Sequence, residues 1–214
     1  MSTADRVADI LRARIAEGFF PPGSRLTEKT IGGALRVSRN TLREAFRLLT
    51  HERLVEHELD RGMFVRVLSV DDVVDLYRVR KLVERAAVRG MDGSSRGLPA
   101  VAAAVVDGER ALNSRNWRAL GTADILFHQA LAALAGSPRL DELMRGVLAE
   151  LRLAFHIMAD PCRFHEPYLA RNREILDRLK AGDPAGAEGL LAKYLDDAQE
   201  QLVTAYRQRT DSET

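Results

Sequence analysis

Two groups of side chains in this 214-residue chain have types and spacings that could support chemistry. In the first, Val37–Phe46, hydroxyl, amide and guanidinium donors fall in the first turns of a segment patterned as an amphipathic helix. A helix N-terminus presents unpaired N–H groups and a partial positive charge, which suit phosphate. Arg39 and Arg43, four residues apart, would place two forked cations on one face. This indicates contact with a DNA major groove; the alternative is a surface helix, capped by Ser38, with solvated arginines.

The second group is the pair Asp124 and His128. A spacing of four residues on a predicted helix projects both side chains from one face, and an Asp-x-x-x-His arrangement of this kind can hold a divalent metal ion. The alternative is a hydrogen bond along the helix face. For a lone Asp/His pair, the hydrogen bond is usually the better interpretation.

Three helices are predicted around the first group. The first spans Ala4–Glu17, and its expected apolar stripe comprises Val7, Ile10, Leu11 and Ile15. The second is expected to begin after a cap by the Thr27 hydroxyl and to reach about Leu35. A tight turn follows, and Ser38 is expected to cap the third helix, whose buried stripe would be Leu42, Ala45, Phe46 and Leu49.

Two short strands are predicted after the third helix, at Leu54–Leu59 and Met63–Leu68. The intervening Asp60-Arg61-Gly62 favours a hairpin, because glycine suits the turn. Helix, short helix, turn, helix and hairpin in this order predict a winged helix-turn-helix, in which the hairpin lies beside the recognition helix.

From Ser69 onward the pattern is helical, and six helices are expected at 71–91, 97–114, 116–136, 138–158, 161–181 and 183–208. The first break between them is predicted at Gly93-Ser94-Ser95. Helices of this length joined by short loops predict an antiparallel bundle with an interior site. The predicted fold is therefore mainly α, with a winged helix-turn-helix DNA-binding domain over residues 1–68 and an all-α antiparallel helical bundle over 69–214.

Composition describes an ordinary globular chain, with 46% apolar and 29% charged residues. No apolar run approaches the ~18 residues that a membrane span needs, and we expect no signal peptide at the N-terminus. Cys162 is the single cysteine, and no motif around it supports a nucleophilic role. Together these features predict a reducing cytoplasm. Residues 1–66 hold 12 Lys and Arg against 9 Asp and Glu, which places any phosphate-facing surface there.

Residues 15–65 resemble the DNA-binding domain of the GntR family of bacterial transcription regulators. The residues that carry the resemblance are Ile15, Gly18, Pro22–Leu26, Glu28, Val37–Arg39, Leu42–Ala45, Leu49, Leu54-Val55 and Arg61–Val65. The chain departs from the pattern at Gly32, where the family usually has alanine, and at Arg36, where it often has glycine. The resemblance implies that DNA contacts come from Lys29, Ser38, Arg39, Asn40, Thr41, Arg43 and Gly62, whereas Arg25 and Arg47 are expected to be solvated or structural.

The remainder is similar to the shorter, six-helix kind of FadR-like effector domain in that family. The carrying residues are Asp75–Tyr77, Arg80–Glu84, Asp124–His128, Gly136–Pro138, Gly182-Asp183 and Ala187. The resemblance implies an effector site made by Arg80, Asp124, His128, Asn172 and Tyr194. Arg80 could bind a carboxylate as a two-pronged pair; the alternative is a salt bridge to Glu84, four residues on.

Metal sites in the family add two histidines, but the aligned positions here are Asn172 and Tyr194. Zinc and nickel prefer imidazole, so we expect no tightly bound metal at Asp124 and His128, although either ion remains possible there. His156 and His165 could complete a displaced site, but nothing in their spacing requires it. The cavity is instead expected to bind a polar organic effector directly, possibly a carboxylate.

Together, these features predict a ligand-responsive transcription regulator that binds a palindromic double-stranded DNA operator as a homodimer, without an enzymatic activity or a membrane partner. One alternative is a metal-dependent enzyme using Asp124 and His128, which would need a third protein ligand and an open coordination position. Another is a helical interaction protein with a vestigial DNA-binding domain.

Overall fold

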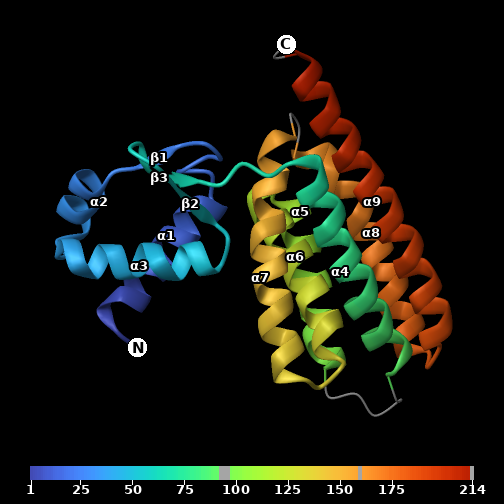
Figure 1. The fold of residues 1–214 in the computed structure, drawn as a ribbon. Helices are drawn as coiled ribbons and strands as arrows, with labels where there is room; N and C mark the ends of the chain where they lie inside the picture. The colour runs from blue at the N-terminus through green and yellow to red at the C-terminus, as the bar shows by residue number, and fades with distance from the viewer. Residues whose placement is uncertain (92–96, 159–160, 213–214) are drawn as a thin grey trace. The chain divides into compact units, whose positions relative to one another are not determined.

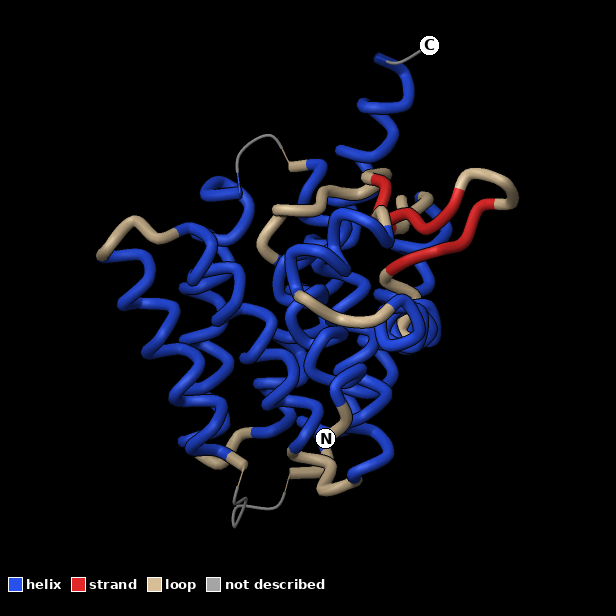
Figure 2. Tube along the Cα trace, turned by 90° about the vertical axis from the view of Figure 1, so that its left-hand side faces the viewer, coloured by secondary structure: helices blue, strands red, loops and turns tan. Residues whose placement is uncertain are grey.

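In a computed structural model, the protein is described over residues 1–91, 97–158 and 161–212. The predicted break at Gly93-Ser94-Ser95 and the side chain of Cys162 lie outside what is described. The chain forms two compact units: residues 1–68 with 149–156, and residues 69–148 with 157–214. Helices build most of both units, and the strands lie together in one small sheet (Figure 2). No described helix combines the length and apolar character that a bilayer span requires.

The first unit contains α1 (Thr3–Ala16), α2 (Glu28–Leu35) and α3 (Arg39–His51), with β1 (Arg25–Leu26), β2 (Val55–Glu58) and β3 (Gly62–Val65) (Figure 1). Ser2 begins α1 with a capping box, since its hydroxyl accepts from the Asp5 N–H and the Asp5 carboxylate accepts from the Ser2 N–H. The stripe of α3 is buried as predicted, at Leu42, Ala45, Phe46 and Leu49.

Two local expectations for these helices are wrong. Ile10 is 44% exposed, because the buried stripe of α1 runs through Ala4, Val7, Ala8, Leu11 and Ile15. Thr27 precedes α2 but its hydroxyl makes no capping hydrogen bond. The first turn of α2 instead carries Glu28, whose carboxylate complements the partial positive charge of a helix N-terminus.

The sheet has the order β1-β3-β2, and both pairings are antiparallel. The hairpin was predicted; β1 was not, because two residues show no periodicity. β2 and β3 are shorter than expected and pair Glu58 with Gly62 at the turn. Arg25 of β1 pairs with Phe64, so a segment that precedes α2 lies against the wing.

The second unit is helical throughout its described residues. It contains α4 (Val70–Arg89), α5 (Leu98–Asn113), α6 (Trp117–Ala133), most of α7 (Pro138–Ala154), α8 (Pro161–Lys180) and α9 (Pro184–Ser212). A short 3-10 turn, Phe155–Ile157, follows α7. These bounds confirm the six predicted helices to within a few residues. α4 packs on α9 and α5 on α6, while α8 contacts α5, α6 and α9, so α4, α6, α8 and α9 enclose a common interior (Figure 1).

Candidate nucleic-acid interface and buried polar cluster

The N-terminus of α3 begins at Ser38, as the sequence predicts. The Ser38 hydroxyl accepts a hydrogen bond of 3.1 Å from the Thr41 N–H and lies 2.8 Å from the Thr41 hydroxyl. Ser38, Arg39 and Asn40 are exposed, whereas Leu42 and Ala45 on the opposite face are fully buried. Burial of one face therefore leaves the polar donors of the first turn facing solvent.

Arg39 and Arg43 are both exposed on α3, but they differ in their partners. The Arg43 Nε–H donates a hydrogen bond of 2.8 Å to Oε1 of Glu28, the first residue of α2. This bond raises the pKa of Arg43 above its ordinary value. Arg39, by contrast, forms no ion pair with any of the described residues. One of the two predicted base-reading arginines is thus held by the neighbouring helix.

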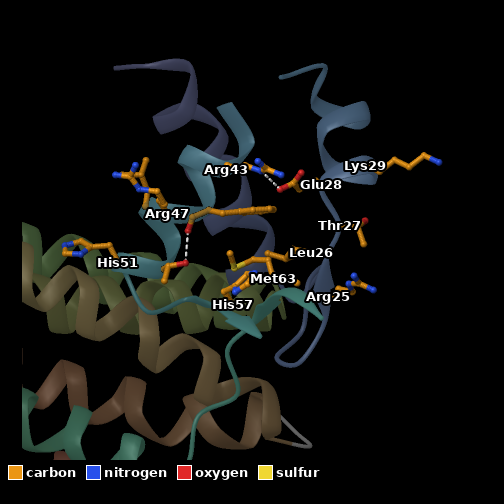
Figure 3. A pocket seen from close by; sticks show the side chains of 14 residues that line it. Arg25, Leu26, Thr27, Glu28, Lys29, Arg43, Arg47, His51, His57 and Met63 are labelled. Atoms are coloured by element: carbon orange, nitrogen blue, oxygen red, sulfur yellow. Dashed lines mark hydrogen bonds and ion pairs between the residues drawn. The ribbon is translucent and has the colours of Figure 1, made fainter. Parts of the chain in front are cut away.

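A groove of about 1160 Å³ lies between α3, the N-terminus of α2 and the small sheet (Figure 3). The residues that line it are Arg25, Leu26, Thr27, Glu28, Lys29, Arg43, Phe46, Arg47, Leu48, Thr50, His51, His57, Gly62 and Met63. Four of them are cationic and one is a carboxylate. The groove therefore has the sign of charge that attracts phosphate.

The predicted DNA-contact residues are distributed unevenly around this groove. Lys29, Arg43 and Gly62 line it, while Ser38, Arg39, Asn40 and Thr41 lie at the start of α3. The side chain of Lys29 extends away from the other labelled side chains (Figure 3). Gly62 has a φ of 104°, a conformation that favours glycine, and pairs with Glu58 at the hairpin turn.

Sequence reasoning gave no binding role to several residues of the groove wall. Arg25 lies beside the wing: a Cβ placed on Gly62 would be 3.5 Å from the Arg25 guanidinium. Arg47 is exposed and forms an ion pair of 3.1 Å with Glu44. His57 and Met63, which face each other across the hairpin register, complete this wall. Only the pairing of β1 with β3 brings Arg25 here, and the sequence contains no signal for it.

The second unit contains a buried chain of ionisable side chains. The Arg80 Nε–H donates to Glu84 Oε1 at 2.8 Å, and the other Glu84 oxygen lies 2.6 Å from His128 Nδ1. Arg80 is 2% exposed and Glu84 is fully buried. Burial acts to raise the pKa of Glu84, but the charge of Arg80 and the bond to His128 outweigh it and lower that pKa. The salt bridge between Arg80 and Glu84, the alternative to a carboxylate site for Arg80, is therefore present.

Asp124 is the centre of an adjoining group. Its Oδ1 accepts hydrogen bonds from Asn172 Nδ2 at 3.0 Å and from the Tyr194 hydroxyl at 2.9 Å, and its Oδ2 lies 3.5 Å from His165 Nδ1. Burial acts to raise the pKa of Asp124, yet His165, His128 and Asn172 hold that pKa well below its ordinary value. The ring centroids of His128 and Tyr194 are 4.9 Å apart, which joins the two groups.

The structure thus brings together all five residues predicted for the effector site and adds Glu84 and His165. The hydrogen bond expected between Asp124 and His128 does not form; each bonds to a side chain on another helix instead. Glu84 was foreseen only as a partner of Arg80, and His165 only as a possible member of a displaced site.

The donor set does not fit zinc or nickel. Within the described part of the chain, no three His, Cys, Asp or Glu side chains are grouped to hold a metal. Asn172 and Tyr194, which stand where histidines would be needed, donate to Asp124 and so occupy one of its oxygens. The space beside Asp124, Asn172 and His165 has no room for a water-sized sphere.

Comparisons with known proteins agree with this architecture. Residues 3–65 match the model of bacterial regulatory proteins of the gntR family, and residues 75–197 match the FCD domain. A crystal structure from Rhodococcus sp. RHA1, assigned to the GntR transcriptional regulators, has a TM-score of 0.93 and 51% identity, covering 96% of this chain and 100% of that one.

Two curated relatives are similar over different lengths. The Nta operon transcriptional regulator of Aminobacter aminovorans is 41% identical over 70 residues, a third (33%) of each chain. The galactonate operon transcriptional repressor of Escherichia coli (strain K12) is 26% identical over 212 residues, covering 88% of this chain and 91% of that protein. With both domains matched in order, the chain belongs to the GntR family of bacterial transcription regulators, in the branch that carries a FadR-like FCD domain.

Proposed function

We propose that this transcription regulator binds a palindromic DNA operator as a homodimer and that a small organic effector, bound in the helical unit, changes its affinity for DNA. Residues 1–68 would supply the DNA contacts, and residues 69–214 the effector site and the dimer contact. The protein would act in the cytoplasm and not as an enzyme. The observation that carries the proposal is the exposed polar face of α3 beside a groove with four cations and one carboxylate.

The DNA-binding part of the proposal assigns different contacts to different residues of the first unit. Ser38, Asn40, Thr41 and the helix N-terminus suit phosphate oxygens. Arg39 and Arg43 suit the O6 and N7 atoms of guanine. Gly62 allows the backbone of the wing to approach the DNA closely, and Lys29 adds a phosphate contact. Two copies related by two-fold symmetry would read half-sites about one helical turn apart, or a multiple of it.

The test is selection of binding sites from random duplex DNA by the full-length protein, followed by titration of the selected duplex at several salt concentrations. We expect a palindromic consensus and an affinity that falls steeply with salt, as when several phosphates are neutralised. A protein that shows no preference among sequences at any salt concentration would contradict the proposal.

The effector part rests on the buried cluster. Among the described residues, Arg80 Nη2, His128 Nε2 and Asn172 Oδ1 are buried polar atoms that lack a hydrogen-bond partner. Such atoms are costly unless a partner satisfies them. Arg80 could bind a carboxylate through its unused edge. Asn172 Oδ1 could accept a hydrogen bond from a hydroxyl or an amide, and His128 Nε2 could accept or donate one according to its tautomer. Because the adjoining space is too narrow for water, binding would require side chains to move.

A thermal-shift screen of small organic acids would test this part, because a ligand that binds only the folded state raises its apparent stability. A stabilising acid should also change operator affinity, by a coupling of about 1–3 kcal/mol if it is typical. Elemental analysis of untagged protein should find no stoichiometric zinc or nickel. A metal at one equivalent per chain would show that the ligand set rearranges from the arrangement described above.

A further inference from the structure

Glu28 is the one carboxylate among the described residues that line the groove. Its position is unfavourable for a surface that approaches phosphates, because a negative charge there repels DNA. Its side chain is 35% exposed, and its Oε1 accepts the Nε–H of Arg43 at 2.8 Å. The two residues belong to different helices and are 15 positions apart, so the bond ties the N-terminus of α2 to the exposed face of α3 (Figure 3).

The atom that Arg43 uses decides what the rest of the guanidinium can do. With Nε bound to Glu28, the donors at Nη1 and Nη2 remain as a terminal fork. This fork matches the O6 and N7 acceptors that guanine presents in the major groove. The side chain of Arg43 is 66% exposed. An exposed arginine samples many rotamers, and holding one of them before DNA arrives reduces the entropy lost on binding.

The other arginines of α3 are not held in this way. Arg47 pairs with Glu44, three residues away on its own helix, at 3.1 Å. That pair lies along one helix and does not connect α3 to α2. Arg39 makes no ion pair within the described part of the chain. The cross-helix bond singles out Arg43 as the arginine whose direction is fixed in the DNA-free protein.

We propose that Glu28 is a specificity-determining positioning residue, which aims the terminal fork of Arg43 at one guanine in each operator half-site. This inference rests on the proposed DNA-binding function. It adds Glu28 as a residue that affects base preference by holding the side chain of Arg43. It also explains why a carboxylate stands in a groove that is otherwise cationic.

The experiment compares Glu28→Ala with Glu44→Ala in the full-length protein. Both variants remove one exposed carboxylate that pairs with an arginine of α3, so they change the net charge equally. Each variant is titrated with the selected operator, with operators carrying each other base pair at every half-site position, and with random duplex. Glu28→Gln, which keeps an oxygen that can accept from Nε, is the conservative variant.

For Glu28→Ala, we expect the ratio of operator to random-duplex affinity to fall about two- to tenfold, the range expected for freeing one immobilised side chain. The loss should be confined to one base pair per half-site. Glu28→Gln should retain part of the preference. Glu44→Ala should change the affinities for operator and random duplex by the same factor, and in an Arg43→Ala background Glu28→Ala should have no further effect at that base pair.

Three results would overturn the inference. Tighter operator binding by Glu28→Ala with unchanged base preference would mean that Glu28 competes with DNA for Arg43. A change of preference that persists in the Arg43→Ala background would mean that Glu28 reads a base itself. Equal effects of Glu28→Ala and Glu44→Ala would mean that only charge matters. Failure of the wild-type protein to prefer any sequence would instead count against the proposed function.

Discussion

Arg43 and Arg80 are held in the same way, each by a carboxylate that accepts its Nε–H at 2.8 Å, yet the two bonds should have different consequences. Arg43 has a side chain 66% exposed, so its pair with Glu28 adds little to stability. Arg80 is 2% exposed and its partner is fully buried. Removing one member of such a pair leaves an uncompensated charge in the interior. Burial thus decides how much each bond contributes to the stability of the fold.

For Arg43→Ala, we expect operator binding to weaken by about 1–3 kcal/mol, with relaxed preference at one base pair. The midpoint of thermal unfolding should change little, since the side chain is mostly in solvent. Titration with the selected operator, together with a melting curve, measures both. Unchanged operator affinity would show that Arg43 is not at the interface.

For Glu84→Gln, we expect a loss of about 3–5 kcal/mol of folding free energy, because the charge of Arg80 would remain buried without its partner. Urea unfolding followed by circular dichroism would measure the loss. The matched control is Glu28→Gln, which removes an exposed partner of an arginine through the same atom. Similar small losses in both variants would contradict the argument from burial.

At the scale of elements, the periodicity of apolar residues predicts the helices. It does not predict features that depend on pairing between segments far apart in the sequence. The stripe of α3 and the six helices after Ser69 follow from apolar spacing and helix-terminal residues, and both are confirmed. β1 has two residues and exists only because β3 is beside it. Glu28 bonds to Arg43, and His165 lies near Asp124, although these residues belong to different helices. Their positions in the sequence do not indicate that they are close in space.

The turn between α2 and α3 contains Arg36, where the family pattern often has glycine. Arg36 ends α2 with a φ of 54°, in the left-handed region that glycine occupies without strain. For Arg36→Gly, we expect a gain of about 0.5–1 kcal/mol, as relief of strain exceeds the added freedom of the unfolded chain. Arg36→Ala, which retains a Cβ, is the control and should give no gain. Equal effects in thermal unfolding would mean that the turn is unstrained.

At the scale of the whole molecule, each unit has its own core, and buried carboxylates occur in both. The second unit contains Glu84 and Asp124, which have lowered pKa values in the folded state. In the first unit, Glu150 is buried and pairs with Arg66 at 2.9 Å, whereas the carboxylates of the α1 capping box and of the groove lie nearer the surface. Acid should therefore act on the second unit through Glu84 and Asp124.

Because folding lowers both pKa values, these groups contribute stability that is complete above their ordinary values of 4.5 and 3.8 and is lost as pH falls through the folded-state values. We expect the free energy of unfolding to change little from these groups between pH 7 and 5 and to fall progressively below about pH 4.5. Asp124→Asn should make this acid dependence shallower, because the amide does not titrate in the folded or the unfolded protein. It should also lower stability at neutral pH. Asp75→Asn, at an exposed ion pair with Arg78, is the control. Urea titrations at a series of pH values measure all three proteins. An equally steep decline in Asp124→Asn would show that Asp124 is not responsible for the acid dependence.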